Sequence, residues 1–597
     1  MLKPSLPALA LAAACVAAHA QTVTEQPEVV VTASRVATTV DAALADVSVI
    51  TRADIEASGA PDLYDLLRMQ AGVDIARAGG PGQQAAVFLR GTNSNHVLVL
   101  VDGVRVASAN TGGLDWSQLP LHAIERVEIV RGPRASYWGS DAIGGVIQIF
   151  TRKLDGPRAA VQYGSYRDAA GSAGIGRWGE QGGFSVQAGL RHVGGFSAQN
   201  PQGFSFNPDD DGYRSRNLAA RGAYRLGAQT LSATLLRNDS DNAFDQGRTH
   251  VVEQSAGVGL DGALAEGWTH RLSLGLAHDS LLTPDFFSLL KSHRESLTWQ
   301  NTFALGAQQR LIAGLEYVEE HGESRDTFAG STLYADSRHN AAAFTGWQGG
   351  AGRLDWELAA RRDQNSEFGG ATTGSAALGL RLADWARVTG SWGRAFRGPN
   401  LNEQFSPGYG GLFAGNPALK PERSRSGELA LELTPTPALR AKLAAYRTDV
   451  SDLIDFTGPA FRAENTARAR IDGVEADLDW HAGAWAASAN ATWQDPRDAR
   501  TDAPLLRRPR HKGNLLLTRT FGERLDAGVE LVAAGPSPDF GGDLPGYAIV
   551  NARLGITLAP AWHLQLRAEN LADRDYALIR GYNTPGRSGW IELVWQP

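Results

Sequence analysis

Apolar and polar residues alternate in short segments from about residue 160 to the end of the chain. The segments 184–191, 474–480 and 485–493 each place apolar side chains on every second position. A period of two is that of a β-strand, whose successive side chains point to opposite faces. Clusters of Gly, Asp, Asn or Pro follow these segments, as is typical of turns. This part of the chain is therefore predicted to be a series of antiparallel strands.

The apolar stripes have the composition of a lipid-facing surface. In 485–493 the stripe begins with Trp485, continues through alanines and ends with Trp493. Aromatic residues at both ends of an apolar band are typical of strands that cross an outer membrane, with the polar face turned to a wet lumen. At about 20 residues per strand and connection, residues 156–597 predict about 22 strands. A soluble β-sandwich or solenoid would also alternate, but the number of repeats favours a barrel.

The chain before residue 150 has a different pattern. It predicts a helix at 52–69, an extended segment at 85–90, a buried strand at 97–101 and a strand–turn–strand unit at 127–150. Such a compact α+β domain is small enough to fill the lumen that a barrel of this width would leave open. The alternative is a soluble domain that precedes the barrel.

The N-terminus has the pattern of a secretory signal peptide. Lys3 precedes an apolar stretch, and Ala18-His19-Ala20 fits a cleavage site, so residues 1–20 are predicted to be removed. The single cysteine, Cys15, lies in this segment, which excludes disulfides from the mature protein. No later segment has the roughly eighteen apolar residues of a membrane helix.

Composition and motifs exclude other classes of protein. The net charge of −7 is spread along the chain without a basic stripe, so nucleic acid is not an expected partner. The 13 histidines do not form metal-binding spacings, and the sequence has no G-x-S-x-G elbow or phosphate loop. The chain is therefore not expected to be an enzyme.

Long segments of the chain resemble a known family. Residues 126–151, RVEIVRGPRASYWGSDAIGGVIQIFT, resemble the plug signature of the TonB-dependent outer-membrane receptors. RGT at 90–92, VLVLVDGVRV at 97–106, SWGRAFRGPNLNEQF at 391–405 and GNPALKPERS at 415–424 are similar to the same family. The resemblance implies an all-β membrane protein: a transmembrane β-barrel of about 22 antiparallel strands with an N-terminal α+β plug domain inside the lumen. It also implies a monomer in the outer membrane of a Gram-negative bacterium. The expected organisation is a signal peptide at 1–20, a periplasmic segment at 21–35, the plug at 36–153 and the barrel at 154–597.

A short valine-rich segment follows the signal peptide. It is rich in β-branched residues and preceded by Pro27, which favours extended backbone over helix. An extended segment can add as an edge strand to the sheet of a partner. By the resemblance this is the TonB box, within about 27–34, through which TonB, with ExbB and ExbD, pulls on the plug. Its residues are Glu28, Val29, Val30, Val31, Thr32 and Ala33. The alternative is a linker that happens to be rich in valine.

Within the family, the chain is most similar to the receptors for cobalamin (vitamin B12). The similarity is carried by VVVTASR at 29–35, FLRGTNSNHVLVLVDGVR at 88–105, DVSDLIDF at 449–456, ARARIDGVEA at 467–476, TDAPLLRR at 501–508 and RGYNTPGR at 580–587. It implies active transport of cobalamin. A ferric siderophore or haem as cargo, and passive diffusion through a porin, are the alternatives. The implied cargo residues are Gln84, Ala86, Asn93, Asn110 and Thr111 of the plug, and Arg507 and Phe540 of the barrel.

An acidic connection offers oxygen ligands for a cation. Residues 207–213 are NPDDDGY, and 238–241 are NDSD. Carboxylates at alternate positions suit a hard cation such as Ca2+. By the resemblance to cobalamin receptors, calcium in the outer loops would be held by Asp209, Asp211 and Asp239. A solvated acidic loop is the alternative.

Overall fold

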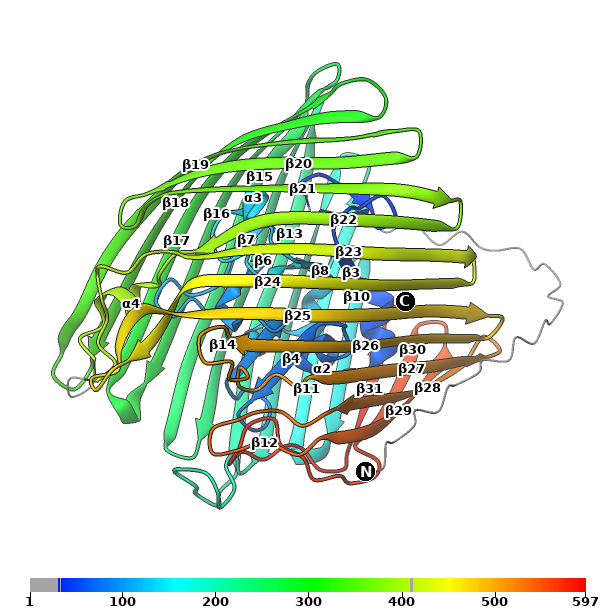
Figure 1. Ribbon diagram of the computed structural model, residues 1–597. Helices are drawn as coiled ribbons and strands as arrows, with labels where there is room; N and C mark the ends of the chain where they lie inside the picture. Colours follow the sequence, from blue (N-terminus) through cyan, green and yellow to red (C-terminus); the bar gives the residue numbers. More distant parts are fainter. Residues whose placement is uncertain (1–29, 33, 409–411) are drawn as a thin grey trace, which may run out of the picture.

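The protein is a closed β-barrel with a smaller domain inside it (Figure 1). The computed structural model describes residues 30–32, 34–408 and 412–597. The 22 strands β10 to β31 follow one another around the barrel, each antiparallel to its neighbours, and β31 pairs back with β10. The predicted all-β membrane fold with an N-terminal plug is confirmed.

The barrel strands are long and joined in chain order. The first half comprises β10 (Gly156–Gly164), β11 (Asp168–Gly179), β12 (Gly182–Phe196), β13 (Asp211–Leu226), β14 (Gln229–Phe244), β15 (Gly247–Ala265), β16 (Trp268–Thr283), β17 (Ser288–Ala304), β18 (Gln309–Asp326), β19 (Ser331–Ala351) and β20 (Leu354–Asn365). The second half comprises β21 (Gly369–Ala383), β22 (Ala386–Arg397), β23 (Glu422–Thr436), β24 (Leu439–Thr457), β25 (Arg462–Ala482), β26 (Trp485–Asp498), β27 (His511–Phe521), β28 (Leu525–Ala534), β29 (Tyr547–Ala559), β30 (Trp562–Glu569) and β31 (Ser588–Trp595). A short helix, α4 (Leu401–Phe405), follows β22.

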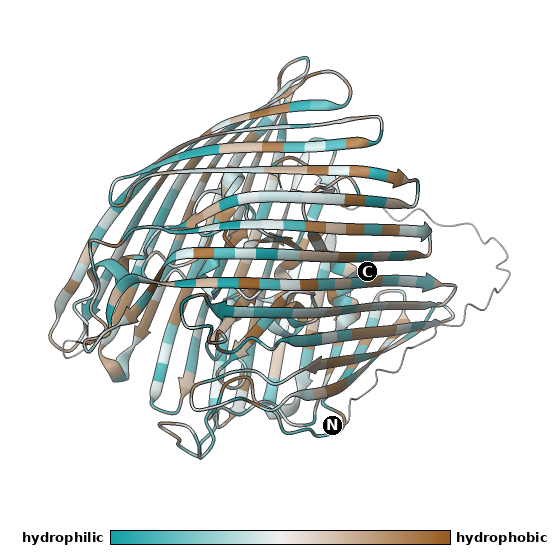
Figure 2. Ribbon diagram, viewed as in Figure 1, coloured by the Kyte–Doolittle hydropathy of each residue, from teal (hydrophilic) through white to brown (hydrophobic). Residues whose placement is uncertain are grey.

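The strands alternate between a lipid face and a lumen face, as predicted. In β12, Phe184, Val186 and Leu190 are exposed on the outside, while Ser185 and Gln187 are buried toward the lumen. Figure 2 shows the alternation as bands of brown and teal along the strands. A closed ladder leaves no unpaired backbone edge, which is the condition for crossing lipid with strands.

The two ends of the barrel differ in the length of their connections. At one end only residues 227–228 join β13 to β14, whereas at the other end 398–421 and 570–587 are long loops. Short turns face the periplasm and longer loops face outward in barrels of this kind. Ser34 and Asp41 line a cavity together with the short turns, so the N-terminal segment lies at the periplasmic end.

The plug is an α+β domain built on a five-stranded sheet with the order β3-β8-β9-β6-β7. A hairpin of β4 and β5 and a short pair of β1 and β2 complete it. Leu67, Ile129 and Ile147 have no exposed surface and form part of its core. Its elements are β1 (Val30–Val31), β2 (Thr38–Thr39), β3 (Val47–Ile50), α1 (Arg52–Ser58), α2 (Leu63–Arg68), β4 (Val73–Arg77), β5 (Ala85–Leu89), β6 (Val97–Val101), β7 (Val104–Arg105), β8 (Ile124–Arg131), α3 (Ala135–Trp138) and β9 (Gly145–Thr151).

One predicted element of the plug is wrong in detail. The single helix predicted at 52–69 is two helices, α1 and α2, because Gly59 takes a left-handed φ of 60° and ends α1. Asp62 then caps α2 by accepting a hydrogen bond from the backbone N–H of Asp65. The predicted turn inside 127–150 likewise contains a short helix, α3. Apolar spacing continues across such breaks, so periodicity alone does not show them.

Two predicted features lie wholly or partly outside the described residues. These are the signal peptide at 1–20 and, within the TonB box, Glu28, Val29 and Ala33. In the part of the chain that the structure describes, no helix is long and apolar enough to cross a membrane.

Candidate functional site

The described part of the valine-rich segment is docked against the plug. Val30 and Val31 are extended and pair with Thr39 and Thr38. The backbone N–H and the hydroxyl of Thr32 both donate to the carboxylate of Glu128, at 2.9 and 2.8 Å. Val31 has no exposed surface. A partner that adds a strand here must first detach this segment from the plug.

Arg35 fixes the end of this segment to the barrel wall. Its guanidinium lies 2.5 Å from the carboxylate of Glu316 on β18. It also lies over the rings of Trp138 and Phe344, at 4.5 and 4.6 Å from their centroids. Glu316 in turn accepts a hydrogen bond from Arg361 at 2.7 Å. A force applied to residues before Arg35 therefore meets this buried ion pair once the contacts of residues 30–32 with Thr38, Thr39 and Glu128 are released.

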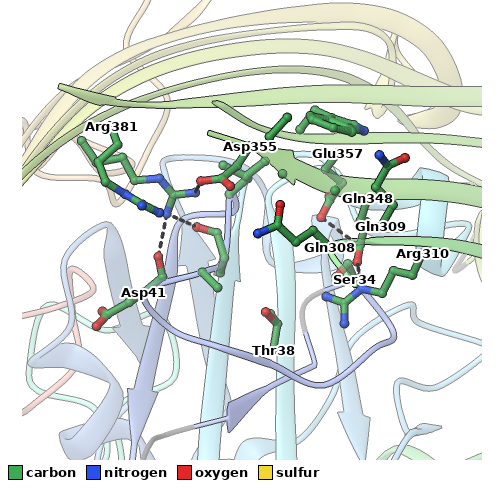
Figure 3. A pocket seen from close by; sticks show the side chains of 18 of the residues that line it. Ser34, Thr38, Asp41, Gln308, Gln309, Arg310, Gln348, Asp355, Glu357 and Arg381 are labelled. Atoms are coloured by element: carbon green, nitrogen blue, oxygen red, sulfur yellow. Dashed lines mark hydrogen bonds and ion pairs between the residues drawn. The ribbon is translucent and has the colours of Figure 1, made fainter. Parts of the chain in front are cut away.

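A cavity of about 880 Å3 separates the N-terminal part of the plug from the short turns. Figure 3 shows Thr38 and Asp41 on the plug side, with Gln308 and Arg310 on the barrel side. Arg387 reaches across and donates to the backbone carbonyl of Asp41 at 2.6 Å. The N-terminal part of the plug thus has free space beside it at the periplasmic mouth.

A buried charge network joins the middle of the plug to three barrel strands. Arg90 of the plug forms ion pairs with Glu428 on β23, Glu475 on β25 and Asp46 of the plug. Asp46 also pairs with Arg131 at 3.3 Å and with Lys442 on β24 at 2.8 Å. We call Asp46, Arg90, Arg131, Glu428, Lys442 and Glu475 the lock.

The charges of the lock are mutually dependent. Burial alone would raise the pKa of the Asp46 carboxyl, but Lys442, Arg131 and Arg90 outweigh it and hold this pKa well below its ordinary value. Removal of one member of such a cluster leaves buried charges without compensation. The resulting loss of folding free energy is far larger than the net contribution of the intact pair. The sequence did not single out these residues, although the alternation of Val474 and Glu475 had placed Glu475 on the polar face.

The outer end of the plug also contacts the barrel near 391–405, the segment that is similar to the family. Arg397 pairs with Glu403 at 2.9 Å and with Glu422 at 2.8 Å. His96 of the plug reaches the carboxylate of Glu422 at 2.6 Å. The loop that carries α4 is thereby held against the plug.

One group of the predicted cargo residues lies around the β4–β5 hairpin. Gln84 is exposed immediately before β5, and Ala86 packs against a cluster that contains Phe88 and Ile579. The side-chain oxygen of Asn93 accepts a hydrogen bond from Arg508 at 2.7 Å. Arg508, which the sequence did not single out, therefore links the plug to the barrel loop at 499–510.

Arg507 and Phe540 form a platform beside this hairpin. The guanidinium of Arg507 lies 5.8 Å from the centroid of the Phe540 ring, and Phe540 is 71% exposed. The buried carboxylate of Asp539 accepts from the side chain of Arg507 at 3.0 Å and from the backbone N–H of Arg580 at 2.6 Å. Asp539, which the sequence analysis did not single out, holds the guanidinium of Arg507 and the ring of Phe540 toward the outside.

The other predicted apex residues have different positions. Asn110 is fully buried, donates to the backbone carbonyl of Lys291 at 2.7 Å and accepts from the hydroxyl of Tyr334 at 3.0 Å. It therefore attaches the apex to the barrel in this structure, and its role as a cargo contact stays a prediction. Thr111 is exposed, and its carbonyl accepts from Asn400 at 3.0 Å.

The predicted calcium ligands do not come together. The carboxylate of Asp211, the first residue of β13, accepts a hydrogen bond from the backbone N–H of Ala198 at 2.6 Å, and Asp209 lies in the loop just before it. Asp239 instead pairs with Arg216, which is about 17 Å along β13 from Asp211 at about 3.4 Å per residue. Within the described ranges, no group of three or more His, Cys, Asp or Glu side chains could hold a metal ion. The predicted trio is corrected, because strand register separates Asp239 from the loop; calcium binding in that loop stays a prediction.

Comparisons with known proteins match both parts of this architecture. The family described as "TonB dependent receptor-like, beta-barrel" matches residues 151–571, and the "TonB-dependent Receptor Plug Domain" matches residues 39–146. The chain belongs to the TonB-dependent receptor family. Receptors of this family lie in the outer membrane of Gram-negative bacteria, as predicted.

The relatives within the family differ in cargo. The chain is 30% identical over 594 residues to the vitamin B12 transporter BtuB of Vibrio vulnificus, which covers 94% of this chain and 92% of that protein. The siderophore receptor PirA of Acinetobacter baumannii has a similar structure, with a TM-score of 0.78, 19% identity and coverage of 92% of this chain and 98% of that one. The ferric enterobactin receptor PfeA of Pseudomonas aeruginosa has a TM-score of 0.78, 20% identity and coverage of 92% and 99%. At such identities the two solved structures show the shared fold.

Proposed function

We propose that this receptor transports cobalamin actively across the outer membrane, driven by TonB with ExbB and ExbD. The observation that carries the proposal is the 30% identity with a vitamin B12 transporter along 94% of the chain. That identity includes the barrel and its loops, where receptors for different cargoes are expected to differ most. A ferric siderophore or haem is the second candidate, because receptors named for siderophores share the fold.

The outer face offers the groups that such a cargo needs. Cobalamin carries amide side chains around a large ring, so its site requires hydrogen-bond donors and acceptors beside an apolar surface. Gln84 and Thr111 are exposed polar side chains of the plug. Arg507 supplies a donor and Phe540 an aromatic face.

The proposed transport step uses the tether and the lock. Cargo binding favours detachment of residues 28–33 to the extent that the cargo binds the two plug states differently. TonB then adds this segment to its own sheet and pulls. The pull breaks the contacts of residues 30–32 with the plug first and then the pair of Arg35 with Glu316, and it moves the N-terminal part of the plug toward the cavity beside it.

Equilibrium binding to the purified receptor tests the cargo. Cyanocobalamin should bind, whereas ferric enterobactin and haem should not. Binding of either iron compound without binding of cyanocobalamin would support the second candidate. Two matched variants distinguish a specific loss of cargo binding from a general one. Arg507→Ala changes the platform and should weaken binding, whereas Arg216→Ala changes the exposed outer part of β13 and should not.

A further inference from the structure

A second cavity lies on the other side of the plug from the cavity beside Thr38. It has a volume of about 970 Å3 and is bounded by α1 and residues 116–122 of the plug, and by strands β10 to β13 and β27 to β31 of the barrel. The first cavity includes residues of β20, which is 11 strands from β31 in the ring of 22. We call the second space the seam cavity, because β31 pairs back with β10 there.

The seam cavity extends along most of the height of the plug. Its lining runs from Pro560, in a short periplasmic turn, to Tyr213, the third residue of β13 at the outer end of that strand. The platform of Arg507 and Phe540 stands on loops between β26 and β29, in the same sector of the barrel. The cavity therefore lies between the periplasm and the proposed cargo platform.

The wall of the seam cavity holds a buried arginine without a partner. Arg158 of β10 lines the cavity and is 6% exposed. Among the described residues its side chain forms no hydrogen bond and has no carboxylate within 4.0 Å, and its Nε is fully enclosed. A buried cation without a partner is strongly unfavourable, so buried charges in proteins are normally paired. An anion that enters the cavity would remove this cost.

The carboxylates nearby do not neutralise this part of the cavity. One oxygen of Glu56 accepts hydrogen bonds from both Arg52 at 2.9 Å and Arg152 at 3.0 Å. Glu592 of β31 also lines the cavity, and in the described part of the chain it forms no ion pair. Burial and the charges of Arg52 and Arg158 lower the pKa of Arg152 to about 10, as expected where cations are in excess. Three guanidinium groups thus share two carboxylates.

We propose that the seam cavity is an inner binding site on the route of the cargo, and that Arg158 binds the phosphodiester of cobalamin there. The proposal rests on the proposed function. Cobalamin joins its ring to a nucleotide through a phosphodiester, which carries a negative charge, and a guanidinium offers parallel N–H donors that match phosphate oxygens. Strand register places Gln162 and Gln565 on either side of Glu592 in the same wall, where they can meet the amides of the cargo.

The proposed movement of the plug would open this site to the cargo. The pull on the tether draws the N-terminal part of the plug toward the first cavity, which lies on the opposite side. The same movement widens the seam cavity below the platform. A transport path requires binding that is favourable enough for entry and weak enough for release. A single unpaired arginine meets both conditions better than a cluster of cations.

Binding of inorganic phosphate to the purified full-length receptor tests the site without the cargo. In equilibrium dialysis with radiolabelled phosphate, Arg158→Gln should raise the Kd about tenfold, because a charge-assisted contact is lost. The matched control, Arg177→Gln, removes an exposed arginine from the neighbouring strand β11 and should change the Kd less than about twofold. Equal binding by the parent and Arg158→Gln would overturn the anion site.

Thermal unfolding separates this role from a structural one. Because Arg158 has no partner in the folded protein, Arg158→Gln should not lower the unfolding temperature of the receptor. A marked decrease would show that Arg158 stabilises the fold, and it would contradict the proposal. Arg158→Lys keeps the charge without the paired donors, so it should restore phosphate binding in part.

Uptake by cells tests whether the site serves the cargo. Arg158→Gln should bind cyanocobalamin at the surface with an unchanged Kd, because the platform is intact, but should accumulate it about tenfold more slowly. Dicyanocobinamide, a corrinoid without the phosphodiester, should accumulate at equal rates in the parent and the variant. An unchanged rate for cyanocobalamin, or equal slowing of both corrinoids, would overturn the role of Arg158 in transport. If the parent binds phosphate through Arg158 but does not bind cyanocobalamin, the proposed function fails while the anion site stands.

Discussion

The plug is attached to the barrel differently in its middle and at its outer end. In the middle, Arg90 and Asp46 each have several buried charged partners. At the cargo platform, Arg507 has one carboxylate partner and is partly exposed, and Phe540 is mostly exposed. The difference fits the proposed function, in which the lock holds the plug in place and the platform stays free to meet a ligand.

The strongest test of this comparison removes one carboxylate from the lock. Asp46→Ala leaves Arg90, Arg131 and Lys442 with too little negative charge, so the plug should lose about 3–5 kcal/mol of stability. Hydrogen exchange of plug amides should accelerate accordingly, while the barrel stays protected by its closed ladder. Glu180→Ala, which removes an exposed carboxylate from a periplasmic turn, is the control. Unchanged protection of the plug amides in Asp46→Ala would contradict the role of the lock in stabilising the plug.

A smaller effect is expected at the end of the tether. Arg35→Ala breaks one pair, but Glu316 keeps Arg361 as a partner, so the cost should be about 1–3 kcal/mol. A spin label on Thr38 should become more mobile because β1 and β2 lose their anchor. Arg310→Ala removes a 3.4 Å contact to the carbonyl of Ala37 and a 2.7 Å hydrogen bond to Gln348 of the barrel, and it should leave the label ordered. Equal mobility in the two variants would contradict the anchoring role of Arg35.

A change at the platform should affect binding and leave the plug in place. Arg507→Ala should raise the Kd for cyanocobalamin about tenfold, or about 1.4 kcal/mol. Hydrogen exchange of the plug should not change, because the lock is intact. Faster exchange without weaker binding would reverse the roles given to the two regions.

Mild acid should have the smallest effect. The pKa of Asp46 is held well below its ordinary value, so its stabilising contribution is complete above the unfolded pKa of about 4 and is lost only as pH falls through the much lower folded pKa. The protection that Asp46 gives the plug, measured as the difference in corrected exchange rates between the parent protein and Asp46→Ala, should therefore agree at pH 7 and pH 5. Marked loosening at pH 5 would show that another group controls the plug.

Much of the fold could be predicted because it depends on local pattern. A period of two identified the strands, and the alternation of Val474 with Glu475 gave the faces of β25 correctly. The partner of Glu475 could not be predicted in this way, because Arg90 is 385 residues away in sequence. The break at Gly59 was missed since a glycine can lie within or end a helix, and only its φ distinguishes the two.

The candidate site was predicted less completely for the same physical reason. Residues near in sequence, such as Asp209 and Asp211, do lie together where a loop meets β13, but the position of Asp239 depends on the register of β13 with β14, which places it opposite Arg216. Asn110 was correctly placed in the plug apex region, yet its burial depends on Tyr334 of β19. The sequence pattern shows on which face of a strand a residue lies, whereas the register of neighbouring strands decides which residues it contacts.

Uptake of labelled cyanocobalamin by cells that carry this receptor tests the central claim most directly. The full chain should accumulate cobalamin above the amount that binds at the surface, and deletion of residues 28–33 should reduce accumulation to surface binding alone. Loss of the proton gradient should have the same effect. Accumulation that is unchanged by the deletion would contradict a plug moved through its tether and would favour passive diffusion.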